Sequence, residues 1–286
     1  MKVLQVADGS GSARLAFLEG TRVSVLEAAH EGIATALDFL LAVGERGLDA
    51  AAWRKGAAFE ETTWDAVAGR LALPVTPAEV WGAGVTYKRS ADFREEGTGI
   101  YDRVYEAARP ELFFKATAAR CVAHGQPIGR RRDSTFTASE PEMAVVVAAS
   151  GRILGFTVAN DVSAWDIERD NPLYLPQSKV YAGCFALGPV VVTADAIADP
   201  LSLSLHCSVV RAGREVFAGS ASTAQLKRPL GDLVDWLRRS NPIPDGTVLS
   251  TGTGIIQPMD VGLEEGDVVS ISCPEIGTLT NPVAWV

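Results

Sequence analysis

Short runs of β-forming residues recur through the later three-quarters of this chain, and they constrain its fold more than any other feature. Glycine, proline and asparagine separate the runs, a pattern typical of strands joined by tight turns. The runs cover residues 142–148, 152–159, 190–193, 201–211, 247–250 and 267–272. One amphipathic helix interrupts them, beginning after Pro229 and ending at Asn241-Pro242. Its apolar face consists of Leu230, Leu233, Val234 and Leu237. The sequence therefore predicts a mostly-β domain with one clear helix.

The first 75 residues have a different pattern. Two alternating runs, at 2–6 and 14–18, flank Asp8-Gly9-Ser10-Gly11 and predict a hairpin. Apolar residues at helical spacing from Ile33 to Leu41 predict a helix that Gly44 ends, and a second short helix is predicted at 63–70. The prolines of Leu73-Pro74-Val75-Thr76-Pro77 mark a boundary. We expect an α+β chain with a small N-terminal α/β domain at 1–75 and a mostly-β domain at 76–286.

Composition narrows the class of protein. With 47% hydrophobic and 21% charged residues the 286-residue chain is ordinary globular protein, and its net charge of −9 argues against a nucleic-acid partner. No segment approaches the roughly 20 apolar residues needed to cross a bilayer. The start of the chain has no secretory signal pattern, so we expect a cytoplasmic protein without a membrane partner. The cysteines, which form no CxxC pair and are expected to be reduced, are Cys121, Cys184, Cys207 and Cys273.

Three carboxylates are predicted to meet at one end of a hairpin. Glu140 and Glu142 lie two residues apart where a strand begins, so their side chains point to the same face. Ser150-Gly151 is a good two-residue turn between this strand and the next. If Ala149 pairs with Arg152, the register places Asp161 opposite Glu140, with Cβ atoms roughly 5 Å apart.

Such a cluster of like charges is unfavourable unless a cation neutralises it. Carboxylate oxygens suit Mg²⁺, or alternatively Mn²⁺, better than zinc, which prefers histidine and cysteine. From the residues alone a second interpretation stays open: two solvated glutamates at the start of a strand and an aspartate that caps a turn.

Several motifs in order resemble the fumarylacetoacetate hydrolase superfamily. The first two are Ser139-Glu140-Pro141-Glu142 and Asn160-Asp161-Val162-Ser163-Ala164-Trp165-Asp166. They are followed by Ser178-Lys179, Gly188-Pro189, Ser250-Thr251-Gly252-Thr253-Gly254 and closing segments at 266–269 and 276–283. The resemblance covers about residues 80 to 283. It implies a catalytic β-roll, a metal held by Glu140, Glu142 and Asp161, and a homodimer or homotetramer.

The chain departs from the superfamily pattern in three places. Trp165 stands where an arginine is usual, and the loop 251–254 lacks the usual proline. Family hydrolases that act on acylpyruvates carry a histidine and a nearby glutamate that activate water, but here Ser90 occupies the histidine position. Without that pair a hydrolase lacks its expected general base.

The segments 84–87, 100–105, 109–117, 171–179 and 241–246 resemble the dehydratase branch of the superfamily. That resemblance implies a hydro-lyase of pentose degradation, whose small-molecule substrate is a 2-oxo acid such as 2-keto-3-deoxy-D-arabinonate (2-dehydro-3-deoxy-D-arabinonate). Dehydration would pass through a metal-stabilised enolate and yield 2,5-dioxopentanoate. The alternatives are an acylpyruvate-type C–C bond hydrolase, an oxaloacetate-type decarboxylase and a non-catalytic binding protein with the same fold.

Lys179 matches the active-site lysine of the family. It is expected to carry protons or bind the substrate carboxylate, and a Schiff base is the alternative. Thr253 is expected to take part in catalysis and, with Thr251, to bind the substrate.

Three further residues are candidates. Glu111 is expected to act as an acid or base, although a salt bridge with an arginine explains it equally well. Arg89 could bind the substrate carboxylate through two hydrogen bonds. His124 could protonate the departing hydroxyl, but a hydrogen-bonded loop histidine is the commoner role.

Overall fold

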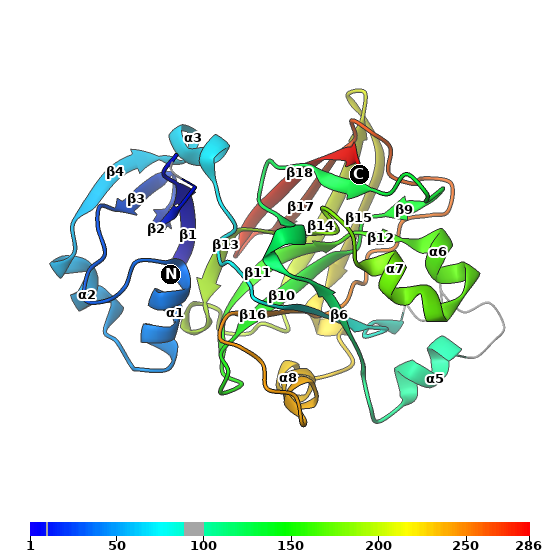
Figure 1. The fold of residues 1–286 in the computed structure, drawn as a ribbon, viewed down its shortest axis with the longest axis horizontal. Helices are drawn as coiled ribbons and strands as arrows, with labels where there is room; N and C mark the ends of the chain where they lie inside the picture. Colours follow the sequence, from blue (N-terminus) through cyan, green and yellow to red (C-terminus); the bar gives the residue numbers. More distant parts are fainter. Residues whose placement is uncertain (10, 89–99) are drawn as a thin grey trace.

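Two β-sheets packed face to face form the centre of the molecule (Figure 1). The structure is a computed structural model and describes residues 1–9, 11–88 and 100–286. Within these residues the larger sheet has eleven strands. Ten of them follow the order β4 (Phe59–Thr63), β3 (Arg22–Leu26), β2 (Ala13–Glu19), β1 (Lys2–Ala7), β13 (Phe185–Thr193), β11 (Ile153–Asp161), β10 (Pro141–Val147), β16 (Thr247–Ser250), β5 (Val80–Gly84), β6 (Glu111–Ala116). Strand β7 (Cys121–Val122) pairs with β13 in parallel.

The smaller sheet has five strands in the described part of the chain. Their order is β15 (Arg214–Ser222), β14 (Ser204–Arg211), β17 (Val268–Cys273), β18 (Gly277–Trp285), β8 (Ile128–Arg130). A two-stranded ribbon joins β9 (Thr137–Ala138) to β12 (Ser163–Ala164). The α-helices described are α1 (Ala36–Gly44), α2 (Ala50–Gly56), α3 (Trp64–Val67), α5 (Ile100–Glu106), α6 (Trp165–Asp170), α7 (Leu175–Lys179) and α8 (Leu230–Arg238). The fold is therefore α+β and dominated by strands, as predicted.

Strand β10 is buried on both faces. Met143, Val145 and Val147 pack in the core between the two sheets. Ala144 and Val146 point the other way, into a second core that includes helix α1. Since alternate side chains of a strand lie on opposite faces, burial on both sides holds the direction of every β10 side chain, including those at its carboxylate-bearing end.

Several predicted elements are confirmed. Strands β1 and β2 form the N-terminal hairpin, and α1 ends at Gly44 after a start where Thr35 and Asp38 make a capping box. Helix α8 buries the four predicted apolar residues. Helix α3 and the 3₁₀ turn that follows it cover 64–70. Two strand boundaries were wrong: β13 begins at Phe185, and β14 begins at Ser204.

The β10–β11 turn differs from the prediction, although the register does not. Ala148 N–H donates to Arg152 O over 2.9 Å, so the loop contains three residues and ends on Gly151 with φ 92°. A bulge follows, because Val147 pairs with Ile153 whereas Val146 pairs with Gly155. The extra loop residue and the extra strand residue compensate each other, and from Gly155 onward the predicted register holds.

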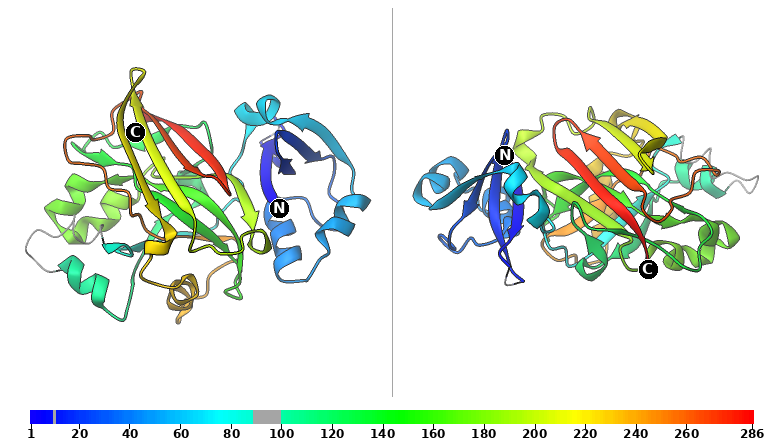
Figure 2. Two further views of the ribbon diagram at one scale, coloured as in Figure 1. Left: turned by 180° about the vertical axis from the view of Figure 1, so that it is seen from behind. Right: turned by 90° about the horizontal axis from the view of Figure 1, so that it is seen from above.

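The N-terminal segment continues the large sheet. Strand β1 pairs with β13 antiparallel, with Lys2 opposite Val192. Figure 2 shows this segment at one end of the molecule in both views. The division into domains at 1–75 and 76–286 stays a prediction. No described helix is both long enough and apolar enough to cross a membrane.

Candidate functional site

Glu140, Glu142 and Asp161 converge as the hairpin register predicts. Asp161 N–H donates to Glu140 O over 3.0 Å, which places the end of β11 beside the residue preceding β10. One ligand oxygen from each of the three carboxylates lies within 4.8 Å of the others. All three residues are buried, with at most 3% of their surface exposed. Among the described residues, these three carboxylates form the group that lies close enough together to hold a metal ion.

Glu142 is held by groups from the end of β16. Ser250 Oγ donates to Glu142 Oε2, and Gly252 N–H donates to the same oxygen over 2.7 Å. Burial, followed by the nearby charges of Asp161 and Glu140, raises the pKa of Glu142 to about 8. Three buried oxygen ligands fit a hard divalent cation such as Mg²⁺ or Mn²⁺, which would relieve this repulsion.

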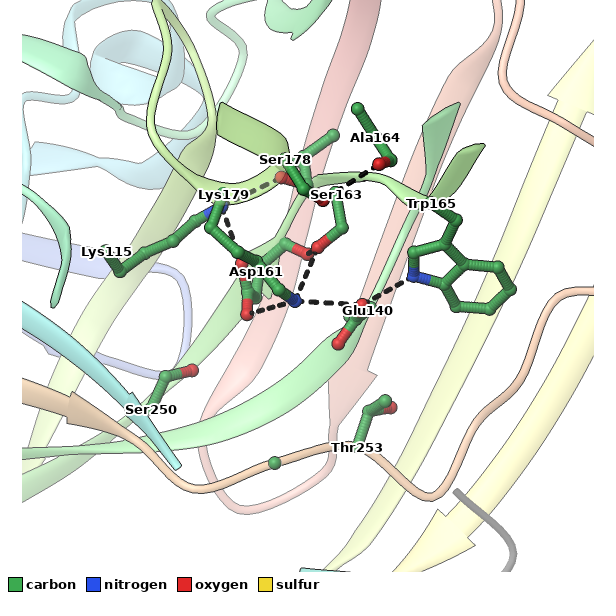
Figure 3. Close-up of polar contacts among 12 residues, drawn as sticks. Lys115, Glu140, Asp161, Ser163, Ala164, Trp165, Ser178, Lys179, Ser250 and Thr253 are labelled. Carbon is green, nitrogen blue, oxygen red and sulfur yellow. Dashed lines mark hydrogen bonds and ion pairs between the residues drawn. The ribbon is translucent and has the colours of Figure 1, made fainter. Parts of the chain in front are cut away.

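Lys179 points into the carboxylate cluster from the end of α7 (Figure 3). Its ammonium donates to Glu140 Oε1 over 3.0 Å, to Asp161 Oδ2 over 2.9 Å and to Ser163 Oγ over 2.7 Å. The Phe113 ring lies below it, 5.2 Å from Nζ to the ring centroid. A lysine that donates to two carboxylates and a hydroxyl is held as a charged ammonium.

Lys115 is a second lysine at the cluster and is not among the site residues predicted from the sequence. Its Nζ forms an ion pair with Asp161 Oδ1 at 2.6 Å, and the residue is completely buried. It belongs to β6, where Lys115 is an extra residue in the pairing with β5, because Trp81 pairs with Phe114 and Val80 with Ala116. Counting in steps of two from Glu111 would have selected Lys115, but the sequence does not reveal this irregularity.

Trp165, which stands where the family pattern has an arginine, donates to the carboxylate cluster. Its indole Nε1 donates to Glu140 Oε1 over 2.6 Å, and its ring stacks on Phe136 with centroids 5.8 Å apart. At this position the chain therefore has an uncharged donor to a metal-ligand candidate.

Thr251 and Thr253 direct their hydroxyls to the backbone of β10. Thr251 Oγ1 donates to Met143 O, and Thr253 Oγ1 donates to Pro141 O, each over 2.7 Å. Thr253 lines the pocket around the carboxylates, and Thr251 is not among the described residues that do. These contacts fix the 250–254 loop, whose Gly252 N–H reaches Glu142.

Glu111 lines the same pocket, which also includes Tyr101, Glu168 and Leu175. Its carboxylate lies across the backbone of Gly84, where an added Cβ would be 2.1 Å from Glu111 Oε2. The glycine on β5 thus makes room for the carboxylate that β6 presents.

One predicted residue, His124, is not among the described residues that line this pocket. His124 is half-buried, its Nδ1 accepts from Thr280 N–H over 3.2 Å, and its ring packs on Trp64. Burial lowers the pKa of His124. Arg89 lies outside the described residues. His30 and His206 contact Trp53 and Ser220 respectively, so none of the three histidines is among the described pocket residues.

The sequence matches a known family over most of its length. The model of the fumarylacetoacetate (FAA) hydrolase C-terminal domain matches residues 79–284. The chain is 50% identical over 221 residues to 2-dehydro-3-deoxy-D-arabinonate dehydratase of Saccharolobus solfataricus, covering 75% of this chain and 74% of that one. It is 43% identical to a probable 2-keto-3-deoxyxylonate dehydratase of Haloferax volcanii, covering 75% of each chain.

A solved structure resembles the whole chain. The structure of 2-keto-3-deoxy-D-arabinonate dehydratase complexed with magnesium and 2,5-dioxopentanoate superposes with a TM-score of 0.86 at 40% identity, covering 100% of this chain and 99% of that one.

Proposed function

The chain belongs to the fumarylacetoacetate hydrolase family, and from that premise we propose that it is a hydro-lyase that converts 2-dehydro-3-deoxy-D-arabinonate to 2,5-dioxopentanoate with Mg²⁺. One structural observation carries the proposal. The pocket joins a buried three-carboxylate cluster to an ammonium, and all three histidines of the chain lie elsewhere. This arrangement suits removal of a proton beside a carbonyl and lacks the histidine that would activate water for hydrolysis.

The residues have distinct roles in this proposal. Glu140, Glu142 and Asp161 hold the cation, which when bound acts as a Lewis acid toward the 2-oxo acid. Lys179, beside two of these carboxylates, binds the anionic end of the substrate and stabilises charge that develops on the C2 oxygen. Glu111, across the pocket, moves the proton between C3 and the departing C4 hydroxyl.

The atoms balance without a co-reactant. C3 loses a proton and C4 loses its hydroxyl, which leave together as water. A proton then moves from C5 to C3, and the resulting enol becomes an aldehyde at C5 when its hydroxyl proton moves to C4. Water is a product only, so no residue is needed to activate it as a nucleophile.

A direct assay tests the proposal. The purified chain with Mg²⁺ should consume 2-dehydro-3-deoxy-D-arabinonate and release one equivalent of an aldehyde that a semialdehyde dehydrogenase oxidises. Oxaloacetate and an acylpyruvate serve as competing substrates in parallel. Cleavage of the acylpyruvate or loss of CO₂ from oxaloacetate, without dehydration of the sugar acid, would overturn it. A chain that binds Mg²⁺ but turns over none of the three would instead be a binding protein.

The proposal extends to assembly and location. We infer a homodimer or homotetramer in the cytoplasm, acting in the breakdown of pentose sugar acids. The assembly is what the superfamily resemblance implies, and the sugar acid named for the dehydratase relative supports the metabolic role. Light scattering after gel filtration measures the assembly, and a single-chain mass of 30.3 kDa would contradict it.

A further inference from the structure

Lys115 is a completely buried lysine behind the carboxylate cluster. It is not among the described residues that line the pocket, whereas Lys179 is. A buried ammonium is costly unless paired charges and acceptors surround it. Its Nζ lies 2.6 Å from Asp161 Oδ1 and donates to Val162 O over 2.8 Å. Lys115 is thus bound to the side chain of Asp161 and to the next carbonyl along the chain.

The two oxygens of Asp161 face two different lysines. Oδ1 is paired with Lys115, and Oδ2 accepts from Lys179 over 2.9 Å. Figure 3 shows the two ammonium groups reaching Asp161 from different directions. Rotation of the carboxylate about its Cβ–Cγ bond would break both contacts, so its plane is held.

The backbone after Asp161 is held from the same side. Val162 O accepts from Lys115 Nζ and also from Tyr181 Oη, over 3.0 Å. The Tyr181 ring lies 5.7 Å from the same ammonium. Lys115 therefore restrains both the main chain and the side chain at the point where β11 ends.

We propose that Lys115 is a positioning residue: its ion pair with Oδ1 of Asp161 leaves Oδ2, which now accepts from the pocket-lining Lys179, as the oxygen that the cation would take over. Asp161 would then hold the cation through one oxygen, and the substrate would supply further ligands. This inference rests on the metal site of the proposed function. It assigns a role to a residue that touches neither substrate nor metal, because Asp161 lies between.

Metal binding without substrate tests the role. In Lys115→Gln the ammonium is removed while an amide donor remains for Val162 O. We expect its Mg²⁺ affinity, measured by calorimetry, to fall about 10- to 100-fold, the range found when a group supporting a metal ligand is lost. Arg211→Gln is the matched control, because Arg211 also pairs with a buried aspartate, Asp267, through contacts of 2.8 Å. Its affinity should equal that of the wild type.

Infrared spectroscopy supplies a readout that a merely structural role would not move. In protein carrying [4-¹³C]aspartate, the difference spectrum on adding Mg²⁺ isolates the ligating aspartate, and the splitting of its carboxylate bands separates one-oxygen from two-oxygen ligation. The wild type should show one-oxygen ligation, and Lys115→Gln should shift toward two-oxygen ligation.

Two results would overturn the proposal. One is a folded Lys115→Gln protein with wild-type affinity, and the other is two-oxygen ligation in the wild type, which decides the matter even if the variant does not fold. Because no substrate is present, failure of the wild type to dehydrate the sugar acid would refute the proposed function alone. A wild type that binds no Mg²⁺ would refute both.

Discussion

The indole Nε1 of Trp165 donates a hydrogen bond to Oε1 of Glu140 over 2.6 Å. The same oxygen accepts from Lys179 Nζ over 3.0 Å. Trp165 is 2% exposed and stacks on Phe136, so its position is set by packing as well as by the hydrogen bond. A buried carboxylate held in this way is oriented before a cation arrives.

Trp165→Phe should weaken Mg²⁺ binding about tenfold, because Glu140 loses an orienting donor. The ring stack can persist, so the free energy of unfolding should fall by only about 1 to 2 kcal/mol. Calorimetry and urea denaturation measure the two effects. Trp81→Phe is the control, since Trp81 Nε1 donates to Glu79 over 2.9 Å and Trp81 does not belong to the described pocket. Equal affinities in the two variants would show that the Trp165 bond does not orient Glu140.

Loss of a residue that supports a metal ligand lowers affinity by up to about 100-fold. Because Glu142→Gln changes a ligand itself, it should reduce Mg²⁺ affinity by more than that. The amide oxygen can still accept from Gly252 N–H, which donates to Glu142 over 2.7 Å, so the fold should persist. Circular dichroism checks the fold and calorimetry the affinity. Retained affinity would mean that Glu142 is not a ligand.

The metal-free protein should lose stability as pH rises from 4.5 to about 8. The pKa of Glu142 is raised from 4.5 to about 8, mainly by burial, so in this window the folded state keeps a proton that the unfolded state has released. Stability therefore falls with increasing pH, while Mg²⁺ affinity rises because the cation needs the carboxylate. Urea denaturation in EDTA at pH 5.5 and 8.5 measures the slope. Glu142→Gln should flatten the dependence of stability on pH. If the slope of this variant equals that of the wild type, groups other than Glu142 cause it.

Borohydride reduction in the presence of substrate should leave the mass of the protein unchanged. A Schiff base requires a neutral amine, whereas Lys179 donates to Glu140, Asp161 and Ser163 as an ammonium. Intact mass spectrometry detects any adduct, and peptide mapping locates it. An adduct on Lys179 would establish imine chemistry and contradict the role proposed for this residue.

Gly84→Ala should lower kcat/KM about 100-fold with little loss of stability. The added Cβ would lie 2.1 Å from Glu111 Oε2, the end of a flexible side chain that can move aside at small cost. Displacing a reacting group by about 1 Å is enough for such a loss. Gly231→Ala on α8 is the control, because nothing lies within 4 Å of its added Cβ. Wild-type turnover by Gly84→Ala would show that Glu111 takes no part in the reaction.

The sequence by itself determined the elements with strong local periodicity. The alternation along β10 and β11 placed Glu140, Glu142 and Asp161 on one side, and the amphipathic spacing of α8 identified its buried face. The turn between β10 and β11 was wrong by one residue, yet a bulge restored the register. Core packing on both faces of β10 explains why, since a slip of one residue would turn Glu142 toward the apolar core between the two sheets.

The tertiary structure alone decided which groups surround the carboxylates. Lys115 reaches a carbonyl 47 residues away, Trp165 reaches Glu140 across 25 residues, and Lys179 reaches it across 39. Local periodicity sets the face on which a side chain lies but not which distant strand or helix packs against that face. The neighbours of the carboxylates follow from the order of strands in the sheet and from the packing of α6 and α7, which bring these donors to one buried place.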